Sequence, residues 1–176
     1  MQKLSMDQLN RVDIETFKKQ EKTPIAIVLD NVRSMHNVGS AFRTADGFAV
    51  ERVILCGITA TPPHREIEKT ALGATQSVEW NHYVETTQAV QDLKAQGYNV
   101  IAIEQAEGSV SLENFAIEPN SKYAFVFGNE VHGVDDEVME MVDTCIEIPQ
   151  FGTKHSLNVS VTVGIVVWDI LKKIKF

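Results

Sequence analysis

The first cluster of residues able to do chemistry is "HNVGSAFRTADG" at 36–47, in which Asn37, Gly39 and Arg43 have N-x-G-x-x-x-R spacing. On a helix, this spacing places an amide at the start and a guanidinium about two turns later. An arginine so placed can bind a phosphate through two parallel hydrogen bonds and can stabilise negative charge as it develops. An asparagine cap followed by a solvated arginine explains the same residues, and this first cluster taken alone favours that simpler interpretation.

The second cluster is "FVFGNEVHGV" at 125–134, an apolar run followed by Gly128, Asn129, Glu130 and Gly133. Glycine loops at strand ends often hold a ligand, because backbone groups without a Cβ can approach it closely. Phosphate is the usual ligand of such loops. Here, however, no Lys-Ser or Lys-Thr pair follows Gly133, and the Glu130 carboxylate would repel an anion. The loop therefore predicts a ligand without a phosphate.

The third cluster is "IPQFGTKHSLNVS" at 148–160, in which an apolar strand end, a proline and a loop lead to Ser156 and Asn158. We expect these two polar residues in the first turn of a final helix. Serine and asparagine are common helix caps, so capping alone could account for both.

Composition bounds the possible functions. The chain has 176 residues and a formal net charge of −8, which argues against indiscriminate nucleic-acid binding but permits a local basic patch. The polar N-terminus lacks the apolar stretch of a signal peptide and no apolar run reaches transmembrane length, so we expect a cytoplasmic protein without membrane contact. The histidines and the two cysteines do not have metal-ligand spacing, so no metal site is expected.

The elements that must position the clusters follow from alternating apolar runs and helical patterns. Apolar runs predict buried strands at 25–30, 52–57, 99–104, 122–128 and 144–149, and helical patterns occupy 3–20, 37–48, 86–97 and 156–171. Strands that alternate with helices predict an α/β fold with a mostly parallel sheet and helices on both faces. We expect a single domain over 23–176, preceded by a helical extension over 1–22.

The last expected helix, 156–171, is apolar on almost every side, with Ser156 as its expected cap. A small domain cannot easily cover such a helix, which favours a homodimer interface there. A position at the centre of the chain's own core is the alternative.

In this order and at these separations, the three clusters resemble the signature motifs of the SpoU-type, TrmH-like RNA 2′-O-ribose methyltransferases of the SPOUT class. The resemblance extends over about residues 25 to 171, with Gln150 where methionine is frequent in the family and Thr162 where alanine is frequent. It implies a deep trefoil knot in the C-terminal part, which the pattern of elements alone does not indicate. It also implies a homodimer, and S-adenosylmethionine as the methyl donor.

The resemblance places the donor on backbone around the motifs. Its sulfonium cation tolerates a nearby carboxylate such as Glu130, which fits a glycine loop that holds no phosphate. The expected cofactor-binding residues are Gly128, Ile148 and Leu157, to which Ile103, Glu104 and Asn129 add contacts.

The resemblance also implies catalytic roles. Arg43 corresponds to the family's catalytic arginine, and we interpret its role as stabilising alkoxide charge, because a guanidinium hardly deprotonates in proteins. Asn37 is expected to orient Arg43 or the ribose, and Glu130 to hold the arginine or the loop. Ser156 and Asn158 are expected to fix the turn of the third motif.

Five basic residues flank the motifs and are expected to form an RNA-binding surface: Arg33, Arg43, Arg65, Lys69 and Lys154. The expected reaction is methylation of a ribose 2′-hydroxyl, with tRNA preferred to rRNA as substrate. The alternative is a non-catalytic RNA-binding protein that retains the fold. A nicotinamide-dependent oxidoreductase is disfavoured, because no G-x-G-x-x-G follows the first strand.

Overall fold

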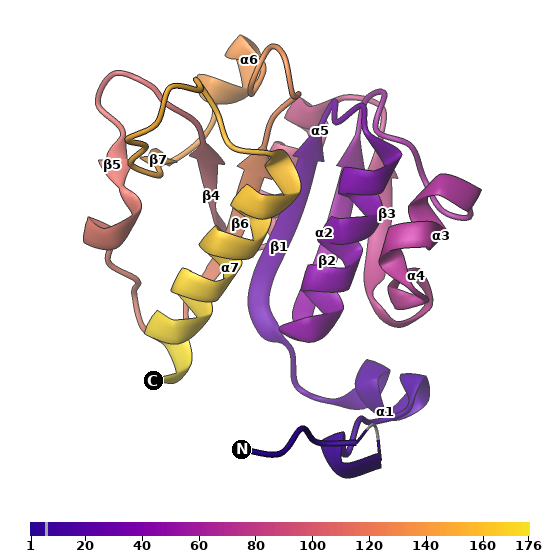
Figure 1. Cartoon of the computed structure of the whole chain (residues 1–176). Helices are drawn as coiled ribbons and strands as arrows, with labels where there is room; N and C mark the ends of the chain where they lie inside the picture. The colour runs from indigo at the N-terminus through magenta and orange to yellow at the C-terminus, as the bar shows by residue number, and fades with distance from the viewer. Residues whose placement is uncertain (6) are drawn as a thin grey trace.

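The computed structural model describes residues 1–5 and 7–176 and contains one seven-stranded sheet in the order β3-β2-β1-β6-β4-β7-β5 (Figure 1). Every pairing between neighbouring strands is parallel. The strands are β1 Thr23–Asp30, β2 Val50–Cys56, β3 Glu79–Tyr83, β4 Tyr98–Ile103, β5 Val110–Ser111, β6 Lys122–Phe127 and β7 Thr144–Glu147. The helices are α1 Ile14–Lys19, α2 Met35–Gly47, α3 Arg65–Ala71, α4 Ala74–Ser77, α5 Thr86–Ala95, α6 Asp136–Met139 and α7 Val159–Lys175.

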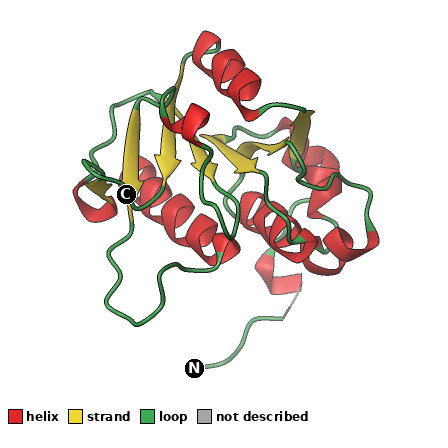
Figure 2. Ribbon diagram, turned by 90° about the horizontal axis from the view of Figure 1, so that it is seen from above, coloured by secondary structure: helices red, strands yellow, loops and turns green. Residues whose placement is uncertain are grey.

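Helices cover both faces of the sheet (Figures 1 and 2). Strand β1 shows why, because Ile25, Ile27 and Leu29 face one core with α2 and α7 while Ala26 and Val28 face the other core with α5 and α6. All five side chains are almost fully buried, as expected for a central parallel strand. The predicted α/β class is confirmed, whereas the trefoil knot stays a prediction.

The five expected strands are all present, but two strands and three helices were missed. Strand β3 has the sequence EWNHY and lies at the sheet edge with most of its residues exposed, so it lacks an apolar run. Strand β5 has two residues, and α4 and α6 have four each, which is too short for a periodic pattern.

The expected helix over 3–20 is wrong in extent. A 3₁₀ turn spans Asp7–Leu9 and α1 covers only Ile14–Lys19, after Asp13 accepts a hydrogen bond at 2.8 Å from the Thr16 N–H. Of the apolar side chains in this range, Phe17 is buried while Leu4, Leu9, Val12 and Ile14 are exposed. Met6, also within the expected helix, lies outside the described residues.

The final helix begins at Val159, so its expected start at 156 and the expected cap Ser156 are both wrong. Asn158 caps α7 by accepting the N–H groups of Ser160 and Val161. One face of α7 is buried in the sheet core, while Val161, Ile165 and Trp168 on the other side are exposed. Over the described residues, no helix is both long and apolar enough to cross a membrane.

Candidate active site

The three motifs meet at the carboxyl ends of the central strands, because all strands of the sheet run in the same direction. The loops after β1, β6, β4 and β7 gather at this edge (Figure 1). Ligand sites of open parallel sheets occur at the same edge.

The glycine loop after β6 forms a turn that satisfies its own backbone groups. Asn129 and Gly133 exchange two backbone hydrogen bonds of 2.9 Å, and the Asn129 side chain accepts the N–H groups of Val131 and His132. The Val134 N–H donates to the Glu104 carboxylate at 3.2 Å. These N–H groups are therefore not available to an anion, which agrees with the prediction that the loop holds no phosphate.

Gly128 lacks a side chain for a different reason from the one we expected. A Cβ on Gly128 would lie 2.1 Å from the carbonyl carbon of Gly133 and 2.2 Å from the nitrogen of Val134. The close approach that this glycine permits is therefore made by the chain's own backbone.

The Glu130 carboxylate holds the loop after β1. Its two oxygens accept the backbone N–H groups of Arg33 at 2.9 Å and Ser34 at 3.0 Å, and the Asn37 side-chain amide donates to it at 3.0 Å. Partial burial acts to raise the pKa of Glu130, but these hydrogen bonds outweigh it and hold the pKa below its ordinary value.

Asn37 joins the second motif to the third. Ser34, and not Asn37, caps helix α2, which leaves the Asn37 side chain free for tertiary contacts. Its amide donates to Glu130, and its carbonyl oxygen accepts a hydrogen bond of 3.1 Å from the Asn158 side chain. One polar chain, Glu130–Asn37–Asn158, thus connects all three motifs.

A cavity of about 530 Å³ opens beside this chain, a volume typical of small-molecule sites. All six residues expected to bind the cofactor line it: Ile103, Glu104, Gly128, Asn129, Ile148 and Leu157. Glu130, Ser156 and Asn158 line it as well. No lysine or arginine contributes to this lining, and Glu104, Glu130 and Glu147 do, so the cavity suits a cation better than a phosphate.

Arg43 does not join the other motif residues. It is exposed on α2 and lines a separate cavity of about 470 Å³ together with Lys69. Asn37 was expected to orient Arg43 or the ribose, and Glu130 to hold the arginine or the loop. Within one chain, the alternatives that involve Arg43 are not formed, since Arg43 lies about 9 Å further along the helix than Asn37, and Asn37 and Glu130 bond to other groups. Glu130 instead binds the backbone of the loop after β1.

The other expected RNA-binding residues lie on separate elements of the fold. Lys69 forms an ion pair of 2.7 Å with Glu66, and Arg65 is the first residue of α3. Arg33 is exposed next to the Glu130 network, and Lys154 is exposed in the loop after β7. In the described part of the chain, Lys69 shares a cavity with Arg43, whereas Arg33, Arg65 and Lys154 line neither that cavity nor the one beside Glu130.

Among the cavity residues that were missed from the sequence are three with polar side chains near the motif loops: Gln105, His132 and His155. His132 lies inside the second motif and His155 directly precedes Ser156, so proximity to the motifs was the available signal. Gln105 follows β4 and belongs to no motif.

Comparison with known proteins identifies the family. The sequence profile of the SpoU rRNA Methylase family matches residues 24–168. The chain belongs to this family. It is 30% identical over 94% of its length to the 23S rRNA (guanosine-2′-O-)-methyltransferase RlmB of Vibrio parahaemolyticus. It is also 30% identical, over 86% of its length, to the tRNA (guanosine(18)-2′-O)-methyltransferase of Borreliella burgdorferi.

A solved structure with the same fold agrees with this family assignment. The AdoMet-bound rRNA methyltransferase from Sinorhizobium meliloti superposes with a TM-score of 0.80 at 26% identity, over 86% of this chain and 57% of that one. The chain spans 66% of the Vibrio protein and 67% of the Borreliella protein. The SpoU resemblance indicated by the motifs is thereby confirmed, and the relatives include one enzyme named for rRNA and one named for tRNA.

Proposed function

We propose that this protein is an S-adenosylmethionine-dependent methyltransferase that methylates a ribose 2′-hydroxyl of RNA. The observation that carries the proposal is the polar chain Glu130–Asn37–Asn158 beside a cavity lined by the second and third motifs. Members of the family that are named for this reaction support it.

The cavity fits the donor chemically. S-adenosylmethionine supplies an electrophilic methyl carbon on a sulfonium cation, and the acidic residues Glu104, Glu130 and Glu147 line the cavity whereas no lysine or arginine does. Gly128, Ile148 and Leu157 would hold it with their backbone groups, while Ile103, Glu104 and Asn129 complete the wall. Asn158 fixes the end of the third-motif loop by capping α7, and Ser156 lines the cavity two residues before it.

Arg43 would act on the RNA side of the reaction. Its guanidinium would bind a phosphate next to the target ribose and stabilise the developing alkoxide, and the proton would pass to phosphate or water. Phe48 lines the Arg43 cavity, and its ring lies 5.9 Å from that of Trp168 of α7, with the two ring planes tilted by 35°. A homodimer across the exposed side of α7 would bring the Arg43 of one copy toward the donor cavity of the other.

Transfer RNA is the substrate we propose first, because a compact, folded RNA suits a small catalytic domain; ribosomal RNA is second. The relatives include enzymes named for each. Arg33, Arg65, Lys69 and Lys154 would contact its phosphates, with the patch completed across the dimer.

The second candidate is an RNA-binding protein without catalysis. The separation of Arg43 from the donor cavity within one chain favours it, whereas the intact polar chain between the motifs opposes it.

Two measurements test the proposal. Calorimetry with S-adenosylmethionine and with NADH should give saturable binding of the first only. Incubation with total tRNA or rRNA and labelled donor should then give 2′-O-methylated nucleosides by mass spectrometry. Donor binding without methylation of either RNA would support the second candidate, and absence of donor binding would refute the methyltransferase.

A further inference from the structure

The segment between β7 and α7 forms one wall of the donor cavity but has little support of its own. Ile148 packs partly against the core, and Asn158 is fixed as the cap of α7. Between them, all residues from 151 to 157 are exposed. Gln150, His155, Ser156 and Leu157 of this segment nevertheless line the cavity. What holds these residues in place therefore decides the shape of the cavity.

A single hydrogen bond supplies that support. In the described part of the chain, residues 149–157 make one hydrogen bond to the remainder of the protein, from the Gln105 side-chain amide to the His155 carbonyl oxygen at 2.6 Å. This bond meets the segment close to its C-terminal end, next to the cavity-lining Ser156 and Leu157.

Gln105 is well placed for this contact because the residue before it is fixed. The Glu104 carboxylate accepts the N–H of Gln105 at 2.9 Å and the N–H of Val134 at 3.2 Å. The Glu104 N–H in turn donates to the Ile146 carbonyl at 3.0 Å, which ties the end of β4 to β7. Two consecutive residues thus hold two different walls of the cavity. Glu104 holds the turn after β6, and Gln105 holds the segment after β7.

We propose that Gln105 is a positioning residue that holds residues 149–157 in the conformation that binds the methyl donor. The proposal rests on the proposed function, since it assigns Gln105 to that same donor cavity. Gln105 acts through the segment that it holds and takes no part in the transfer of the methyl group.

Two variants separate the hydrogen bond from the size of the side chain. Gln105→Glu keeps the shape but replaces the N–H donor with an oxygen that repels the His155 carbonyl, and Gln105→Ala removes the contact. Gln96→Ala is the matched control, because Gln96 is exposed at the end of α5 and accepts its one side-chain hydrogen bond from Arg52.

Tryptic cleavage after Lys154 reports on the segment without any donor. Lys154 is exposed within it, and mass spectrometry distinguishes cleavage there from cleavage at other lysines and arginines. We expect both Gln105 variants to be cut at Lys154 several times faster than wild type and Gln96→Ala at the wild-type rate, with the thermal midpoint of all three near wild type. Cleavage at the wild-type rate in both Gln105 variants would overturn the proposal.

Donor binding completes the test. One lost hydrogen bond should weaken the affinity for S-adenosylmethionine about five- to tenfold. The KM for the donor should rise by the same factor, while kcat at saturating donor and the KM for RNA should stay within about twofold. Faster cleavage with unchanged donor affinity would overturn the positioning role. If wild type bound no donor at all, the proposed function would fail, whereas the cleavage rates would still measure the Gln105 contact.

Discussion

Asn37 is the residue that makes the site one unit, because its amide group contacts Glu130 with its nitrogen and Asn158 with its oxygen. An aspartate there would repel Glu130, and a leucine would leave both partners without a hydrogen bond. Asn37 is available for this task because Ser34 caps the helix that carries it. Within one chain, these contacts are structural, and we propose that groups facing the RNA supply the chemistry.

We predict that Arg43 is needed for methyl transfer but not for binding of the methyl donor. Arg43→Ala should cut methyl transfer by roughly a hundredfold, the usual loss for one preorganised charge stabiliser, while S-adenosylmethionine affinity stays within a few-fold. Arg43→Lys should recover little, because a point charge cannot replace the planar fork. Arg11→Ala, which changes an exposed arginine of the N-terminal segment, is the control. Near-normal turnover of Arg43→Ala, or loss of its donor binding, would contradict the assignment.

Glu130 gives the fold a defined dependence on pH. Because the pKa of Glu130 is lowered in the folded state, its stabilisation is complete above the ordinary value of 4.5 and is lost as pH falls through the lowered pKa. The Asp30 carboxyl affects the pH dependence of stability in the opposite direction. Burial raises its pKa, so the folded state disfavours its ionised form.

Glu130→Gln should therefore unfold about 1 kcal/mol more easily than wild type at pH 7, and this difference should shrink below pH 4.5. Urea denaturation at several pH values measures both effects. Glu107→Gln, a change of an exposed loop carboxylate, should follow wild type at every pH. A constant difference between Glu130→Gln and wild type across the range would show that the carboxylate charge does not matter.

At the scale of the elements, the turn after β6 depends on two backbone segments in contact. A Cβ on Gly128 would approach backbone atoms of Gly133 and Val134 to within 2.4 Å, and backbone cannot move aside as a flexible side chain would. Gly128→Ala should cost about 2–3 kcal/mol of stability and abolish measurable donor binding. Gly47→Ala is the control, since nothing lies within 4 Å of its added Cβ. A Gly128→Ala protein with wild-type donor affinity would contradict this account.

Some of the strands and some of the site could be predicted from the sequence, and others could not. Strands β1, β4 and β6 were predictable because they are apolar and buried almost throughout, and β2 and β7 share part of that pattern. The shared direction of these strands brought all six residues expected to bind the methyl donor to one cavity. The exposed edge strand β3 has no such pattern. The distance of Arg43 from Glu130 and the contact of Gln105 with His155 depend on tertiary geometry, which residue spacing does not contain.

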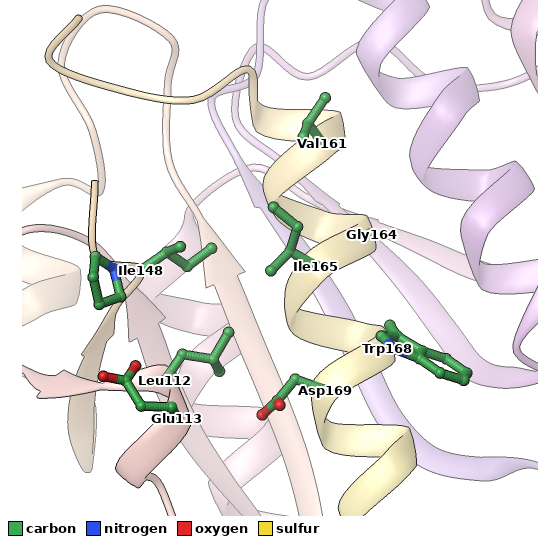
Figure 3. A pocket seen from close by; sticks show the side chains of 9 residues that line it. Leu112, Glu113, Ile148, Val161, Gly164, Ile165, Trp168 and Asp169 are labelled. Atoms are coloured by element: carbon green, nitrogen blue, oxygen red, sulfur yellow. The ribbon is translucent and has the colours of Figure 1, made fainter. Parts of the chain in front are cut away.

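At the scale of the whole molecule, the outer side of α7 borders an apolar groove that is exposed on the surface of the single chain. It has a volume of about 530 Å³ and is lined by Ile148, Leu112 and residues of α7, and Figure 3 shows Ile165 directed into it. On the same helix, 51% of Val161 and 49% of Trp168 are exposed. A second copy of the chain would bury this surface, so we predict a homodimer with twice the 19.6 kDa mass of one chain.

Sedimentation at micromolar concentration tests the dimer. Val161→Glu places a charge in a groove whose lining already contains Glu113 and Asp169, and it should produce monomers. Val84→Glu changes a valine that is 75% exposed outside the groove and should leave the dimer intact. A wild-type protein that sediments at 19.6 kDa would remove the dimer from the account.

Mixing of inactive variants tests whether the dimer completes the active site. If Arg43 of one copy serves the donor cavity of the other, a mixed dimer of Arg43→Ala and Gly128→Ala contains one intact site, built from the cavity of the first chain and the arginine of the second. Random exchange makes half of all dimers mixed, each with one of two sites intact, so methyl transfer should recover to about a quarter of wild type. If Arg43 instead acts within its own chain, mixing should give no recovery. Every chain then carries either a site without its arginine or a site with a defective donor cavity.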